Sequence, residues 1–97
     1  MKFTAFVEYA QEPERIAQAR PAHRAYLQDL LDQGRLVLAG PFIDGSGALF
    51  VYDAPNEEVA ARLADDDPFA RASLFKRVVM KPWALAFSSP LHLAPEL

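Results

Sequence analysis

His23 and Asp67 carry side chains of the types that enzymes use to move protons. Imidazole changes its charge near neutral pH, and a carboxylate that touches it fixes the tautomer of the ring and stabilises its protonated form. His23 precedes Tyr26 and Leu27 by three and four residues, so on a helix it projects from the side that packs on the rest of the fold. We therefore expect His23 to be partly buried and able to act as a base.

Each of these two residues also has a purely structural interpretation. His23 could be a core histidine hydrogen-bonded to the backbone, because buried polar groups are as a rule satisfied. Asp67 precedes Pro68, where its carboxylate would accept backbone N–H bonds at the start of a short helix. Capping a helix and contacting an imidazole are compatible, so both interpretations of Asp67 stay open.

Other reactive groups do not form a recognisable site. The second histidine, His92, lies in a Pro-containing tail and the chain has no cysteine, so we predict no metal site. Asp65 and Asp66 extend Asp67 to an acidic run, which we interpret as a solvated helix end, although such a run could attract a divalent cation. The segment 45–47 lacks the flanks of a nucleophile elbow and predicts a turn. With no cofactor motif visible, we expect chemistry without a cofactor.

Composition places the chain among globular proteins of one domain. Its 97 residues are 52% hydrophobic and 24% charged, which is ordinary for a chain that folds. A net charge of -3 and scattered Lys and Arg residues disfavour binding to nucleic acid. Glu8 interrupts the first apolar stretch before a signal peptide or membrane span could form. Together with the lack of cysteine, this favours a cytoplasmic protein outside the membrane.

The elements that must position His23 can be placed by periodicity. Alternating apolar residues predict a strand over residues 2–9, and helical spacing predicts a helix over residues 21–33 that Gly34 ends. Residues 11–19 are either a loop or one or two helical turns before the proline at position 21 interrupts them. His23 then falls in the first helical turn, where the helix dipole and burial favour the neutral ring.

The remainder of the chain predicts further strands and a second helix. These are a strand over 36–42, a strand over 48–53, a helix from the cap Asn56 to about Asp65, a short helical piece over 68–72, and a bent or edge strand over 75–87. The order predicts a ferredoxin-like α+β fold, βαββαβ, with a four-stranded antiparallel sheet and both helices on one face. Because the later strands are apolar on both sides, we expect an identical subunit to cover the other face.

Five short motifs occur in order along the chain. They are Arg20-Pro-Ala-His23, Gly34 with Leu36, Gly40-Pro41-Phe42, Asp67-Pro68-Phe69 and Lys81-Pro82-Trp83. Together they resemble the YCII-related (YciI-like) family over roughly residues 1–87, which leaves 88–97 as a C-terminal tail. The resemblance implies a ferredoxin-like domain that dimerises into an α+β barrel, with His23 and Asp67 as a His–Asp pair in a pocket. Ser73 stands where the family commonly has Gly, a departure that affects the local loop geometry.

The resemblance also implies a class of chemistry. One branch of the family removes chloride from a hydroxylated chloroaromatic, and related dimeric barrels include lactone isomerases and cofactor-free monooxygenases. We therefore predict a cofactor-independent lyase, dehydrochlorinase or isomerase for a small cyclic or aromatic substrate, with its pocket between the first helix and the sheet. The residues expected to bind this substrate are Arg20, Tyr26, Phe42, Phe69 and Ser73. The alternative is a non-catalytic dimeric module that binds a small metabolite or supports another enzyme.

Overall fold

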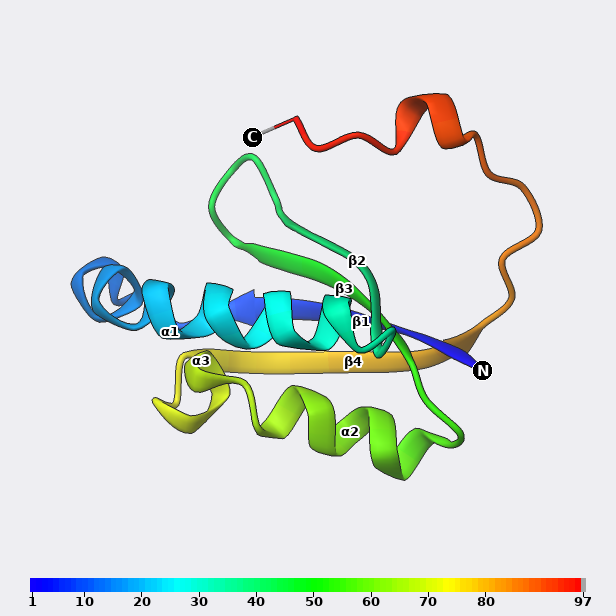
Figure 1. Ribbon diagram of the computed structural model, residues 1–97. Helices are drawn as coiled ribbons and strands as arrows, with labels where there is room; N and C mark the ends of the chain where they lie inside the picture. Colours follow the sequence, from blue (N-terminus) through cyan, green and yellow to red (C-terminus); the bar gives the residue numbers. More distant parts are fainter. Residues whose placement is uncertain (97) are drawn as a thin grey trace.

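The computed structural model describes residues 1–96, and its elements follow the predicted order (Figure 1). Their bounds are β1 Lys2–Tyr9, α1 Pro13–Asp32, β2 Leu36–Pro41, β3 Gly47–Asp53, α2 Glu57–Asp65, α3 Pro68–Arg71 and β4 Phe75–Trp83. In the tail, one turn of 3-10 helix, η1, covers Pro90–His92. None of the helices within residues 1–96 is long and apolar enough to cross a membrane.

The four strands form one antiparallel sheet in the order β2-β3-β1-β4, which confirms the predicted ferredoxin-like α+β fold. Strands β1 and β3 are central, and β4 is an edge strand that carries Pro82 opposite Phe3. An edge strand tolerates proline because only one of its sides must supply hydrogen bonds to a neighbour. The last strand, predicted over 75–87 as bent or at an edge, is therefore an edge strand, and it ends earlier than predicted, at Trp83.

Both α1 and α2 pack on the same face of the sheet. Alternation along β1 places Phe3, Ala5 and Val7 on this inner face, and all three are buried. They join Leu30 of α1 and Leu63 of α2 in one hydrophobic core. The inner face of the sheet and the two helices therefore enclose the space into which the buried side chains of α1 project.

Helix α1 is longer than predicted, because Pro21 does not interrupt it. Proline lacks the N–H that would bond the carbonyl of Ala17, but both residues are exposed, so water can serve that carbonyl. Figure 1 shows α1 changing direction toward its N-terminal end instead of stopping. His23 consequently lies in the middle of α1, and the prediction that it sits in the first turn near the positive end of the dipole is wrong.

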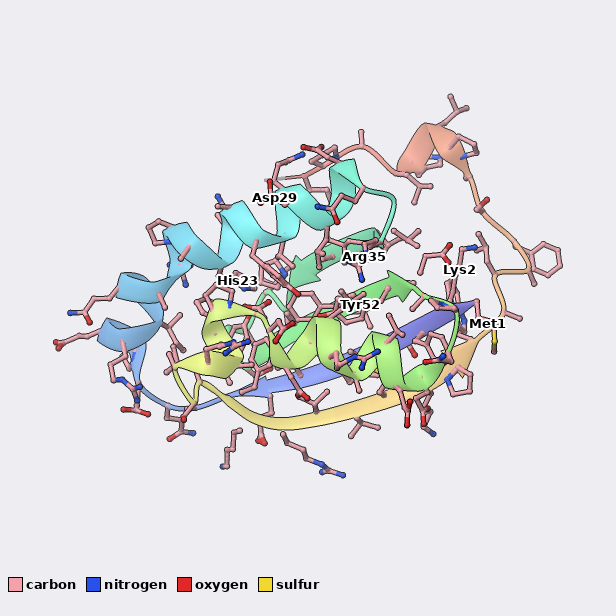
Figure 2. All side chains as sticks on the ribbon, turned by 60° about the horizontal axis from the view of Figure 1, so that its bottom comes forward. Met1, Lys2, His23, Asp29, Arg35 and Tyr52 are labelled. Carbon is pink, nitrogen blue, oxygen red and sulfur yellow. The ribbon has the colours of Figure 1, made fainter. Side chains whose placement is uncertain are left out.

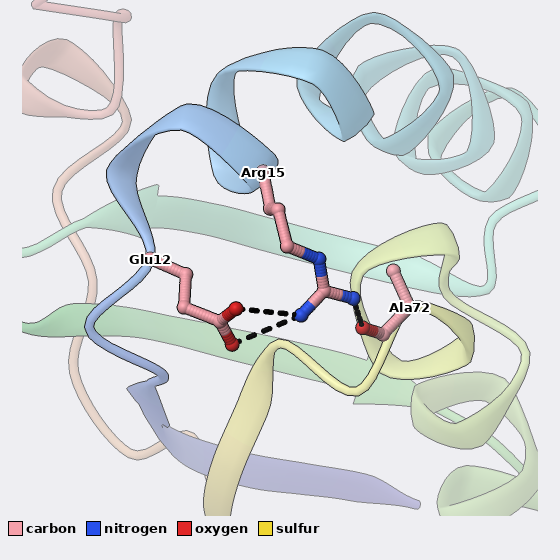
Figure 3. A network of polar contacts seen from close by, with 3 residues as sticks. All are labelled: Glu12, Arg15 and Ala72. Atoms are coloured by element: carbon pink, nitrogen blue, oxygen red, sulfur yellow. Dashed lines mark hydrogen bonds and ion pairs between the residues drawn. The ribbon is translucent and has the colours of Figure 1, made fainter.

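The start of α1 is tied to the segment between α3 and β4. Arg15 Nη1 donates to both carboxylate oxygens of Glu12 at 2.9 Å, and its Nη2 donates to the carbonyl of Ala72 (Figure 3). A single guanidinium thus bridges two segments that lie far apart in the sequence. This contact fixes α3 against α1, and α3 is the element that presents Asp67.

Two helices end in the same backbone arrangement, with one residue in the left-handed region. After α1 this residue is Gly34, with φ of 72°, as predicted for the helix stop. After α3 it is Ser73, with φ of 60°. The Ser73 N–H bonds the Ala70 carbonyl at 2.9 Å and the Leu74 N–H bonds the Phe69 carbonyl at 2.8 Å, which is the Schellman pattern. Glycine suits this position best, so Ser73 adopts a conformation that is unfavourable for a residue with a side chain.

The outer face of the sheet is partly apolar and open. Phe6 on β1 is 50% exposed, and Leu38 and Trp83 are also exposed. Only β3 is buried on both faces, since Val51 of its outer side is buried, whereas β2 is largely exposed after Leu36. Within the single chain, the expectation of strands buried on both faces therefore holds for β3 alone.

Candidate functional site

His23 and Asp67 come into contact although 44 positions separate them in the sequence. His23 projects from the middle of α1, and Asp67 is the N-cap residue of α3. His23 Nδ1 and Asp67 Oδ1 are 2.7 Å apart, with the His23 side chain 9% exposed and that of Asp67 fully buried. This distance is typical of a charge-assisted hydrogen bond between imidazole and carboxylate.

The same carboxylate oxygen also caps α3. Asp67 Oδ1 accepts the backbone N–H of Phe69 at 2.8 Å, and Pro68 fills the first position of the helix. The structural interpretation of Asp67 and its contact with His23 are therefore both realised, through one atom. Because the cap anchors the carboxylate to the backbone, the partner of His23 is held in place before any ligand arrives.

Aromatic rings restrain the imidazole. The Phe69 ring stacks on His23 with centroids 3.8 Å apart and an interplanar angle of 4°. The Phe50 ring meets His23 at 6.0 Å in an edge-on arrangement of 87°. Turning the imidazole over within its plane would break the bond to Asp67, so the two ring nitrogens keep distinct environments.

Those environments assign a separate role to each ring nitrogen. An ionised carboxylate can only accept hydrogen bonds, so we expect Nδ1 to carry the proton that lies between it and Asp67 Oδ1. In the neutral ring the lone pair then lies on Nε2. Nε2 has no hydrogen-bond partner among residues 1–96 and is not one of the fully buried polar atoms. This nitrogen is available to an external proton donor.

The five residues predicted to bind substrate occupy different positions. Phe69 is buried and touches His23 through the stack described above. Tyr26 lies about one turn after His23, and its hydroxyl donates to the Leu63 carbonyl at 2.6 Å. The remaining three are exposed and make no hydrogen bond or ion pair with the dyad: Arg20 on α1, Phe42 after β2 and Ser73 after α3.

Three tyrosines lie within the electrostatic reach of Asp67. Burial, followed by negative charge that includes Asp67, raises the pKa of Tyr26 to about 12. Burial and then the charge of Asp67 also raise the pKa of Tyr52. The same two causes raise the pKa of Tyr9, where the positive charge of Arg20 partly offsets them. Tyr52 is fully buried and was missed by sequence reasoning, although the alternation of β3 places it on the inner face.

Two surface cavities lie away from the dyad. One of about 570 Å³ opens between α1 and α2, where Tyr26, Arg35 and Arg62 line it, and one of about 280 Å³ lies between α2 and β4. Neither is lined by His23 or Asp67, so a pocket at the dyad remains a prediction. Figure 2 shows His23 and Tyr52 in the interior between α1 and the segment formed by α2 and α3. Among residues 1–96, no cluster of three or more acidic or histidine side chains is arranged to hold a metal ion.

Known proteins are similar to this chain in sequence and in fold. The YCII-related domain matches residues 1–84. Protein YciI of Escherichia coli O6:H1 and Protein YciI of Shigella flexneri are each 34% identical over 96 residues, covering 84% of this chain and 98% of theirs. The 5-chloro-2-hydroxyhydroquinone dehydrochlorinase of Burkholderia phenoliruptrix AC1100, in complex with 2,5-dihydroxybenzoquinone, has a TM-score of 0.78 at 21% identity and covers 89% of this chain and 96% of its own. The chain belongs to the YCII-related family, as its ordered motifs predicted.

Proposed function

We propose that this chain is a cofactor-independent enzyme of the lyase, dehydrochlorinase or isomerase type, acting on a small cyclic or aromatic substrate. His23 moves the proton and Asp67 orients the imidazole. The observation that carries the proposal is the buried contact of 2.7 Å between His23 Nδ1 and Asp67 Oδ1, while Nε2 has no hydrogen-bond partner among residues 1–96. General base catalysis by a histidine uses an unprotonated ring nitrogen within reach of the substrate proton, and Nε2 is the nitrogen that would supply it.

The chemistry follows from the two ring nitrogens. Nε2 accepts a proton from a hydroxyl or an activated C–H of the substrate, and the electron pair stays on the substrate. The resulting imidazolium is stabilised by the negative charge of Asp67 at Nδ1. In an elimination the electron pair expels chloride and His23 passes its proton to water. In an isomerisation His23 returns the proton to a different ring atom.

The likeness to the dehydrochlorinase supports a choice of substrate class. That protein was solved with 2,5-dihydroxybenzoquinone, a small ring that carries hydroxyl groups. For this chain we propose a substrate of comparable size, with one hydroxyl directed at Nε2 of His23. The exposed guanidinium of Arg20, on the same helix as His23, would receive an anionic oxygen of such a substrate.

The decisive experiment compares His23→Asn with the wild type on a panel of hydroxylated and chlorinated ring compounds, with chloride release and chromatography as readouts. An asparagine amide keeps a donor near the position of Nδ1 but provides no base at the position of Nε2. We expect turnover to fall by roughly a hundred- to ten-thousand-fold. His92→Asn in the exposed tail is the matched control and should retain wild-type turnover. Turnover by His23→Asn close to that of the wild type would contradict the proposal.

A second copy of the chain is the partner that we propose for the open face of the sheet. Burying the half-exposed ring of Phe6 and its apolar neighbours against the same surface of another subunit gives a closed two-fold dimer. Light scattering should then give twice the chain mass of 10.8 kDa. Phe6→Asp should dissociate the dimer, whereas Ile43→Asp in the exposed hairpin turn should not. A monomeric wild type would refute this arrangement.

A non-catalytic module is the second candidate, favoured by the two cavities that exclude the dyad and by the capping role of Asp67. In that case ring compounds would raise the melting temperature of the wild type without forming product. His23→Asn would then lower the melting temperature and change nothing else.

A further inference from the structure

Two polar atoms in the interior lack a hydrogen-bond partner within residues 1–96. They are the hydroxyl oxygen of Tyr52 and Oδ2 of Asp67. Both side chains are fully buried, at 0% exposure. Buried polar groups in folded proteins are almost always paired, so each of these atoms requires a partner that residues 1–96 do not supply.

The two buried side chains are connected through a series of contacts in the core. The Tyr52 ring stacks on Phe50 with centroids 6.0 Å apart, and Phe50 in turn meets the edge of His23, the partner of Asp67. Burial raises the pKa of the Tyr52 phenol, and among charged groups Asp67 contributes the largest further rise. The hydroxyl and the carboxylate thus interact electrostatically, although they do not bond directly to each other.

We propose that one buried water molecule bridges the Tyr52 hydroxyl and Asp67 Oδ2, and that Tyr52 is thereby a positioning residue of the His23–Asp67 pair. The water accepts the Tyr52 O–H and donates to the carboxylate oxygen, which satisfies both orphaned atoms in a polar site. Oδ1 is already occupied by His23 and by the Phe69 backbone. With Oδ2 anchored as well, the carboxylate cannot rotate.

The neighbouring tyrosine provides a matched comparison. The Tyr26 hydroxyl is committed to the Leu63 carbonyl at 2.6 Å, so it does not need the water. Removing the hydroxyl of Tyr52 should loosen Asp67, whereas removing that of Tyr26 should not. The contribution of Tyr52 to proton transfer rests on the proposed function, but the bridging water does not.

A high-resolution crystal structure of the wild type tests the water itself. We expect one ordered water within hydrogen-bond distance of both the Tyr52 hydroxyl oxygen and Asp67 Oδ2. A direct bond between these two atoms, or density for no water between them, would overturn the proposal. This measurement needs no variant, so it stands even where Tyr52→Phe does not fold.

Proton NMR tests the positioning role. The His23 Nδ1–H proton, held by Asp67, should resonate far downfield and exchange slowly with solvent. In Tyr52→Phe we expect its exchange to accelerate about tenfold or more, as for loss of a hydrogen bond to a charged group. Tyr26→Phe should stay at the wild-type rate. A wild-type rate in Tyr52→Phe would refute the role of Tyr52. Neither measurement uses a substrate, so a failure of the proposed enzymatic activity would leave both results interpretable.

Discussion

The free energy of unfolding should reveal how strongly Asp67 is tied to His23. Asp67→Ala removes the cap of α3, which costs about 1 kcal/mol, and the hydrogen bond with His23, which costs a further ~2 kcal/mol as a charge-assisted bond. Both bonds converge on the buried atom Oδ1, at 2.7 and 2.8 Å. We therefore expect a loss of about 3 kcal/mol in total.

Asn56→Ala is the matched control for this substitution. Asn56 caps α2 by accepting the Val59 N–H at 2.9 Å, but it is exposed and its side chain has no second partner within residues 1–96, so its loss should cost about 1 kcal/mol. Urea titration of both variants gives the two losses directly. In a His23→Phe background, Asp67→Ala should lose only the stability that the α3 cap provides, because the bond to His23 is already absent. An Asp67→Ala variant that loses no more stability than Asn56→Ala would refute the reasoning.

Three further predictions concern the backbone and the phenols. Ser73→Gly should raise the free energy of unfolding by up to about 1 kcal/mol, because Gly relieves the strain at φ of 60°; an unchanged urea midpoint would contradict this. Gly47→Ala should cost about 3 kcal/mol or more, since its Cβ would lie 1.7 Å from the carbonyl oxygen of Val7, whereas Gly40→Ala, with open space around it, should cost far less in the same titration. Because the pKa of Tyr26 rises from 10.0 to about 12 on folding, the unfolded chain loses this proton first. Stability present below pH 10 should therefore fall as the pH rises toward 12, and Tyr26→Phe should show a shallower fall in urea titrations across this range.

Local signals in the sequence predicted most of the fold. Alternating apolar residues located β1, Asn56 marked the start of α2, and Gly34 marked the end of α1. Each of these signals acts through neighbouring residues, so no tertiary information is required. The predicted start of α1 was wrong because the effect of Pro21 depends on whether the carbonyl of Ala17, four residues earlier, faces water. Only the folded structure shows this.

The candidate site was predictable in part. The motif resemblance selected His23 and Asp67, and the Asp-Pro sequence correctly predicted the cap of α3. Their contact brings together residues 44 positions apart, and no helical or strand period relates such positions. The sequence did not distinguish Tyr52, because a tyrosine on the inner side of a strand has the same pattern as any core aromatic residue. That its hydroxyl lacks a partner can be recognised only once the surrounding residues are placed in the structure.

The tautomer of His23 is the most direct test of the account, because a base at Nε2 requires the proton to sit on Nδ1. Nitrogen-15 NMR of the histidine rings distinguishes the two nitrogens, and His23→Asn assigns the signals against those of His92. We predict a protonated Nδ1 and an unprotonated Nε2 in the neutral ring of His23. A ring that carries its proton on Nε2 would contradict the account, since that nitrogen could then only donate.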